Sequence, residues 1–88
     1  MNRARYSAVL DHIRDNPDQW DQEDRFKCVA GHAVSLFGTP QERAHVLARN
    51  PMFGEAQCAQ RLLELTDADA DKIFDPGTTI TELEAGLK

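Results

Sequence analysis

Residues 25–38 read Arg-Phe-Lys-Cys-Val-Ala-Gly-His-Ala-Val-Ser-Leu-Phe-Gly, the longest largely apolar run in a chain of 88 residues. Gly38 and the Thr39-Pro40 pair that follows indicate the end of one helix and the start of another. Apolar positions surround nearly the whole helix, which is typical of a helix packed among others. We therefore predict a central buried helix over about residues 23–37, in which Gly31 admits a close neighbour.

The segments on both sides of this run show amphipathic helical spacing. Tyr6, Val9, Leu10 and Ile13 form one apolar stripe in a predicted helix over about 3–15, which Asn16-Pro17 ends. A weaker stripe follows in residues 40–49, and Thr39, Thr66 and either Thr78 or Thr79 are predicted helix N-caps. Further helices are predicted at 55–65, at 67–74 and from 80 onwards.

The predicted fold is all-α, a compact bundle of five or six short helices around the central one. No segment alternates with period two for more than a few residues, so no strand is expected. Because 88 residues supply a single core, residues 1–88 are predicted to form one domain.

The net charge of −5 is concentrated in residues 64–88, which hold seven acidic and two basic side chains. An acidic chain repels phosphate backbones, so nucleic acid is not an expected partner. The longest uncharged stretch, residues 28–41, is shorter than the roughly 20 apolar residues of a membrane span. Two cysteines are too few for a disulfide framework, and no signal-peptide pattern is present, so the cytoplasm is the expected location.

One candidate metal site combines Cys28 and His32, four residues apart, with Cys58, His12 or His45 as further ligands. The closely spaced pairs of cysteines or histidines that mark structural zinc sites are absent from the sequence. Single cysteines on apolar helix faces are more often small core residues. We therefore expect no bound metal or cofactor, and keep a zinc-stabilised domain as an alternative.

The acidic segment after residue 66 resembles the start of an EF-hand loop, with Asp67, Asp69 and Asp71 at alternate positions. That loop requires glycine at its sixth position and glutamate at its twelfth, where this sequence has Lys72 and Thr78. The aspartates are better explained as the first turn of a capped helix, where the helix dipole favours negative charge. Their exposed carboxylates are also candidates for binding a basic protein.

No arrangement of residues predicts catalysis. A cysteine nucleophile needs an exposed thiolate, whereas the helix carrying Cys28 and His32 is predicted to be buried. The sequence also contains no phosphate-binding glycine loop or nucleophile elbow. We predict that the protein is not an enzyme.

Three polar or aromatic residues are candidates for a small pocket. Trp20 either anchors its loop by burying its ring or is a surface recognition residue. Gln22 is expected to bond to the backbone of residues 18–20, or to form a polar pocket with Trp20 and His32. Met52 and Phe53 occupy a short apolar connector that is a candidate exposed contact.

The order of several short motifs also resembles a known group of proteins. The motifs are Asn-Pro-Asp-Gln-Trp-Asp-Gln at 16–22, Cys-Val-Ala-Gly-His at 28–32 and Leu-Thr-Asp-Ala-Asp-Ala-Asp-Lys-Ile-Phe at 65–74. In this pattern the chain resembles small uncharacterised all-helical proteins of actinobacteria and their phages. The resemblance implies an all-α fold and a cytoplasmic setting, including that of a phage-infected host, and it implies no activity.

The leading functional hypothesis is a small cytoplasmic interaction module that binds another protein and is able to self-associate. It rests on the lack of assembled chemistry, the acidic C-terminal third and the apolar connector. Besides the zinc-stabilised domain, a further alternative is an acidic mimic of nucleic acid or inhibitor, which would dock on a basic protein through residues 64–88.

Overall fold

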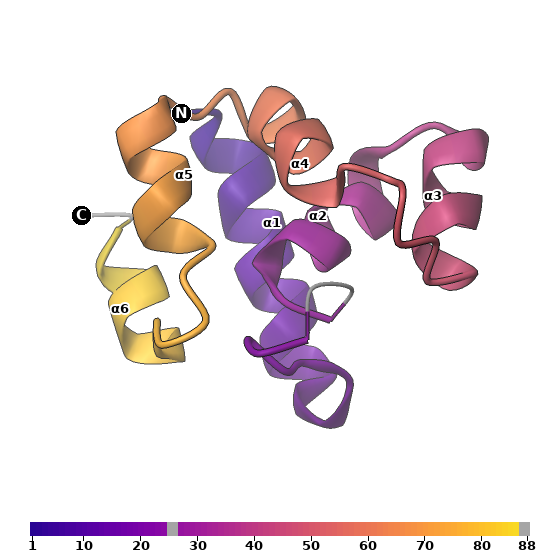
Figure 1. Ribbon diagram of the computed structural model, residues 1–88. Helices are drawn as coiled ribbons and strands as arrows, with labels where there is room; N and C mark the ends of the chain where they lie inside the picture. The colour runs from indigo at the N-terminus through magenta and orange to yellow at the C-terminus, as the bar shows by residue number, and fades with distance from the viewer. Residues whose placement is uncertain (25–26, 87–88) are drawn as a thin grey trace.

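The structure, a computed structural model, describes residues 1–24 and 27–86 and has no strand in these ranges (Figure 1). The predicted all-α fold is confirmed. The described helices are α1 (Arg3–Asp15), the 3-10 turn η1 (Pro17–Gln19), α2 (Val29–Phe37), α3 (Pro40–Leu47), α4 (Glu55–Leu63), α5 (Asp67–Ile73) and α6 (Ile80–Ala85).

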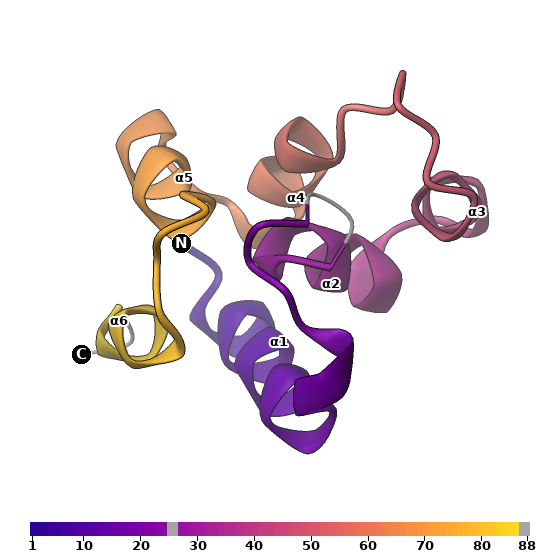
Figure 2. The same ribbon diagram turned by 60° about the horizontal axis from the view of Figure 1, so that its bottom comes forward.

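In the view of Figure 1, helix α1 lies between the α5–α6 pair and helices α2 and α4. Helices α2 and α4 pack on one side of it, and α5 with α6 lies on the other side (Figures 1 and 2). Helix α3 packs against α2 and is at the opposite end of the molecule from α5 and α6. The molecule therefore has two different ends, separated by a core of α1, α2 and α4.

Helix α2 is central, as predicted, and residues 29–34 are all buried. Its predicted start at about residue 23 is wrong, because the helix begins at Val29 and has Cys28 as its N-cap. Residues 21–24 form a turn instead, in which the N–H of Asp24 donates to the carbonyl of Asp21, and the N–H of Cys28 donates to the carbonyl of Asp24. The apolar position predicted at Phe26 lies outside the described residues.

The bounds predicted for α1 are confirmed, and its apolar stripe is fully buried. The Tyr6 hydroxyl donates to the carbonyl of Leu83 in α6, and burial raises the pKa of Tyr6 to about 12. Arg14 forms an ion pair of 3.0 Å with Glu84 on the surface above this contact. These contacts fasten α6 to α1.

The threonine caps are confirmed. Thr39 and Thr79 each form a reciprocal capping box with the glutamate three residues later, and Thr66 accepts from the N–H of Asp69. Gly38 separates α2 from α3, where a Cβ would lie 2.6 Å from the carbonyl oxygen of Val34. A side chain at this position would therefore collide with the end of α2.

Helix α3 buries only Val46. In the weaker stripe predicted for residues 40–49, Ala44, Leu47 and Ala48 are exposed instead of inward-facing. These three residues are spaced i, i+3 and i+4, so they share one helix face, whereas Val46 lies on another. Only one of these two faces can pack against α2, and it is the face of Val46.

Among the described residues, no helix has both the length and the apolar content that crossing a membrane would require.

Candidate binding site

Gln22 is buried, as expected for a polar residue before the central helix, but its partners differ from those predicted. Its side-chain Nε2 donates to the carbonyls of Ile73 (2.9 Å) and Asp75 (3.0 Å), at the end of α5. Its Oε1 accepts from the N–H of Val29 at 3.3 Å, which is in the first turn of α2. Gln22 therefore joins the loop before α2 and the start of α2 to the distant end of α5, and has a structural role.

Trp20 is half-buried against the core, and its indole N–H donates to Oε1 of Gln22 at 3.3 Å. This geometry supports the interpretation of Trp20 as an anchor for its loop. The pocket predicted from Trp20, Gln22 and His32 stays a prediction; of the three residues, His32 lines the groove described below.

His32 is buried, with 6% of its surface exposed, and its Nε2 lies 3.0 Å from the carbonyl oxygen of Gln19. Its ring also meets the ring of His12 edge-on, with 5.1 Å between centroids. Burial lowers the pKa of His32 below its ordinary value of 6.5, against the opposing effect of the Gln19 carbonyl. The imidazole is therefore neutral near pH 7 and is held by backbone contacts.

Both cysteines are buried, and neither forms a disulfide bond in the described part of the chain. The Cys58 thiol donates to Glu42 Oε2 at 2.9 Å, and this carboxylate oxygen also accepts from Arg61 at 2.7 Å. Burial, assisted by the Glu42 contact, raises the pKa of Cys58 to about 11, and burial also raises the pKa of Cys28. Both thiols are therefore protonated at neutral pH, which is unfavourable for a nucleophile or a metal ligand.

Nowhere in residues 1–24 and 27–86 do three or more histidine, cysteine or acidic side chains gather in a geometry able to hold a metal ion. The candidate zinc ligands Cys28 and His32 sit at the N-cap and in the first turn of α2. The ring nitrogen of His32 that faces Gln19 is already occupied by that carbonyl.

The aspartates after Thr66 lie in the helix α5 and not in a calcium-binding loop. Asp67 and Asp71 are exposed, and Asp69 is half-buried. Asp67 accepts a hydrogen bond of 2.8 Å from Gln60. Asp67 and Asp69 lie in the first turn, in agreement with the predicted role of acidic residues near a helix N-terminus, whereas Asp71 lies in the following turn.

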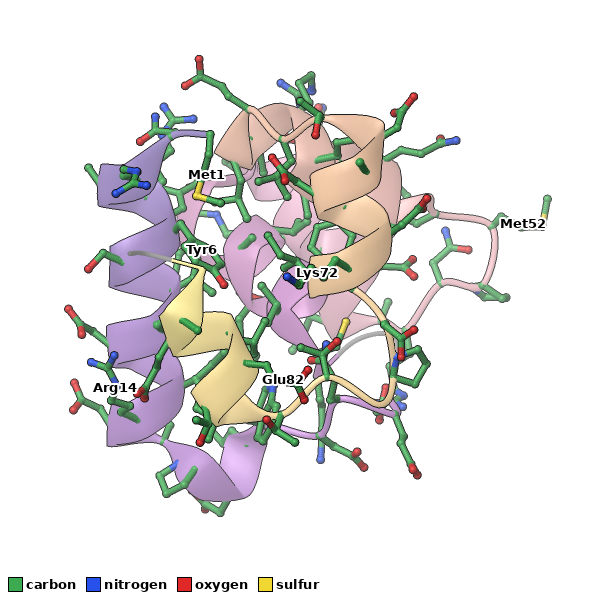
Figure 3. All side chains as sticks on the ribbon, turned by 90° about the vertical axis from the view of Figure 1, so that its left-hand side faces the viewer. Met1, Tyr6, Arg14, Met52, Lys72 and Glu82 are labelled. Atoms are coloured by element: carbon green, nitrogen blue, oxygen red, sulfur yellow. The ribbon has the colours of Figure 1, made fainter. Side chains whose placement is uncertain are left out.

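The segment of residues 40–54, here named the α3 segment, carries exposed apolar side chains. Leu47 is 87% exposed and Met52 is 90% exposed, and Met52 points away from the body of the molecule (Figure 3). Phe53 is half-buried and stacks on His45, with 5.1 Å between ring centroids. The predicted connector is therefore exposed at Met52 and anchored at Phe53.

A groove of about 350 Å³ opens between the C-terminal half of α1, the loop before α2, and helices α2 and α3. We name it the basic groove, because none of its described lining residues is acidic. Its ionisable lining residues are Lys27, Arg43, Arg49, His12 and His32.

The remaining lining of the basic groove is of two kinds. Gln19 and Ser35 contribute polar side chains, and Val46 and Leu47 form an apolar wall on α3. Because Leu47 belongs both to this wall and to the exposed face of α3, the groove and the α3 segment are one continuous surface.

A second cavity, of about 90 Å³, lies between the N-terminus, α5 and α6. Figure 3 shows Met1, Tyr6, Lys72 and Glu82 around it. It is smaller than typical small-molecule sites of about 300–1,000 Å³, and Asp69 and Glu82 oppose the charge of Lys72. The larger groove is the better candidate site.

Sequence reasoning missed Leu47 and the three cations of the basic groove. The one available signal was that Arg43 and Leu47 are four residues apart, which places a cation beside an apolar side chain on one face of a helix. Lys27 and the α2 wall of the groove come from other segments, and no sequence spacing connects them with α3.

No protein-family model, no curated protein and no solved structure matches the chain. The resemblance to small helical proteins of actinobacteria and their phages therefore stays a prediction, and the functional argument rests on the geometry.

Proposed function

We propose that this protein is a small, non-catalytic interaction module that binds a partner protein through the α3 segment. The observation that carries the proposal is the exposure of Leu47 and Met52, at 87% and 90%, in a chain whose other described large apolar side chains are, apart from Met1, buried or half-buried. Both residues belong to the α3 segment.

Burial of these side chains by a partner supplies a driving force for binding. Covering a leucine or methionine side chain is worth about 1.5–3 kcal/mol for each residue. Ala44 and Ala48 flank Leu47 on the same exposed face of the helix, so a partner helix or loop is able to approach the α3 backbone closely. This arrangement suits an apolar anchor on the partner.

The charge beside this apolar face favours an acidic partner. Arg43 and Arg49 belong to the α3 segment, and Lys27 lines the basic groove together with them. A symmetric contact between two copies through this face would bring the same cations together, which is unfavourable. We therefore infer that an acidic, partly apolar segment of another protein binds this surface. Self-association through α3 is the competing result that the light-scattering experiment below would detect.

Absence of catalysis is part of the proposal. Its support is that both thiols are buried and protonated, so neither is an activated nucleophile. Two buried cysteines that do not form a disulfide are also in keeping with a reducing compartment such as the cytoplasm. A host protein of a phage-infected cell is the partner that the resemblance predicts.

The test is affinity capture with the tagged full-length chain, followed by identification of the captured protein by mass spectrometry and by titration of the purified partner. We expect Leu47→Ser combined with Met52→Ser to lower the affinity at least tenfold. Binding should also weaken as the salt concentration rises, because the groove cations are screened.

The matched control changes the other end of the molecule, through Asp67→Asn, Asp69→Asn and Asp71→Asn together. We expect this variant to bind the partner protein with unchanged affinity. Loss of binding in the aspartate variant, with retention in the Leu47 and Met52 variant, would favour the acidic mimic and overturn the proposal. Light scattering of the chain alone should give a monomer, and a dimer that the Leu47 and Met52 variant abolishes would also overturn it.

A further inference from the structure

We propose that the basic groove binds a small organic phosphate, that is, a phosphomonoester group carried by an apolar body. The groove shares Arg43, Leu47 and Arg49 with the surface proposed for the partner protein, but binding of a phosphate is measured on the protein alone, so the two proposals are tested independently.

The size of the groove is the first argument. Its volume of about 350 Å³ falls within the range of small-molecule sites, which is about 300–1,000 Å³. It is lined by four separate parts of the chain, namely α1, the loop before α2, α2 and α3.

The charge of the groove is the second argument. Arg49 forms an ion pair of 2.6 Å with Asp24, so its charge is largely balanced. Within the described part of the chain, neither Lys27 nor Arg43 forms an ion pair, which leaves two positive charges facing the groove. A phosphomonoester carries a charge of about −1.5 to −2 at pH 7 and matches them, whereas one carboxylate does not.

The orientation of Arg43 is the third argument. Its Nε donates to the carbonyl of Gly38 at 3.1 Å, which fixes the plane of the guanidinium. No described residue accepts from its two terminal nitrogens. A planar guanidinium held in this way offers two parallel donors to a phosphate, with little further loss of side-chain entropy. The hydroxyl of Ser35, exposed on α2, adds a neutral donor.

The apolar wall explains why an organic phosphate is favoured over inorganic phosphate. Val46 and Leu47 line one side of the groove and offer no hydrogen bond to an oxyanion. An apolar ligand body against this wall gains from the burial of its own surface and that of the exposed Leu47.

The test uses phenyl phosphate as the probe, followed by titration calorimetry and by backbone amide NMR of the full-length chain in a phosphate-free buffer. We expect saturable binding of one molecule, with the largest shift changes at Ser35, Arg43 and Leu47. Inorganic phosphate and benzoate should each bind at least fivefold more weakly, because the first lacks the apolar body and the second carries one charge.

Substitutions distinguish a built site from general attraction to a cation. Lys27→Gln and Arg43→Gln should each weaken phenyl phosphate binding about tenfold, and Arg43→Lys should lose less than Arg43→Gln. Lys72→Gln changes the net charge equally on α5, outside the groove, and should leave the affinity unchanged. Unaltered NMR dispersion in each variant shows that it is folded.

Three results would overturn the proposal. They are the absence of saturable binding, equal affinity for benzoate and phenyl phosphate, and a loss for Lys72→Gln equal to that for Lys27→Gln. These three results concern phosphate binding to the protein alone. They leave the proposed partner protein untested, because that proposal is tested by measuring the affinity of the partner for the Leu47→Ser and Met52→Ser variant.

Discussion

The α3 segment and the α5–α6 pair are built alike but use their apolar side chains differently. Both consist of short helices with threonine caps on the outside of the α1–α2–α4 core. The α5–α6 pair places Ile73 and Leu83 in the core, whereas α3 leaves Leu47 87% exposed. One end of the molecule therefore contributes to folding, and the other offers an apolar surface beside cations for binding.

The same substitution at two leucines should show this difference most strongly. Leu83 is 1% exposed and packs under α1, so Leu83→Ala should lower the free energy of unfolding by about 2–5 kcal/mol. Leu47→Ala should change it by no more than about 0.5 kcal/mol. Urea denaturation followed by circular dichroism measures both, and equal losses at the two sites would contradict the distinction between the two ends.

A second pair of variants compares buried and exposed glutamines. Gln22→Ala should cost about 2–3 kcal/mol, because it leaves the buried carbonyl of Ile73 and the N–H of Val29 without their partner. Gln41→Ala, at an exposed position of α3, should have little effect on stability. Hydrogen exchange should show faster opening of α5 in the Gln22 variant, and an unchanged α5 would show that Gln22 does not fasten it.

The pH dependence of stability should report on His32, next to the basic groove. Because the folded pKa lies below 6.5, the unfolded chain binds a proton there that the folded protein does not. Protonation of His32 therefore does not reduce the free energy of unfolding above about pH 6.5. The free energy of unfolding falls as the pH drops through this value towards the lowered pKa of the folded state.

The variant His32→Gln should flatten that part of the profile. His45→Gln, which removes an exposed histidine from α3, is the matched control. A profile for the His32 variant with the same slope as the wild type would contradict burial of a neutral imidazole. Glu42 acts in a separate window, because its pKa of about 2, lowered mainly by the Cys58 hydrogen bond, makes stability fall as the pH drops from 4.5 towards 2.

The smallest predicted loss of stability comes from removing a helix cap, and it should be equal at the two ends of the molecule. Thr39 and Thr79 form the same capping box at α3 and α6, so Thr39→Ala and Thr79→Ala should each cost about 1 kcal/mol. Thermal unfolding of the two variants measures this. A much larger loss at Thr79 would mean that the α6 cap supports packing on α1 as well as its own helix.

Much of the fold could be predicted because its signals are local. The stripe of Tyr6, Val9, Leu10 and Ile13, with Asn16-Pro17 behind it, gave the bounds of α1, and threonine caps marked α3, α5 and α6. The start of α2 was missed for the same reason. Acidic residues after Asp21 look like a first helical turn, but the true N-cap, Cys28, makes no side-chain cap bond.

The candidate site was less predictable because it depends on tertiary contacts. The hydrogen bonds of Gln22 reach residues 51 and 53 positions away. The basic groove combines Lys27 from a loop with Arg43 from another helix, and the packing of Val46 on α2 decides that Leu47 faces outwards. The sequence contains each residue but has no spacing that relates them.

Hydrogen exchange of the full-length chain, with and without the captured partner protein, tests the central claim most directly. We predict that the partner slows amide exchange in residues 40–54 and leaves residues 64–86 unchanged. Slower exchange in residues 64–86, with no change in residues 40–54, would contradict the assignment of binding to the α3 segment.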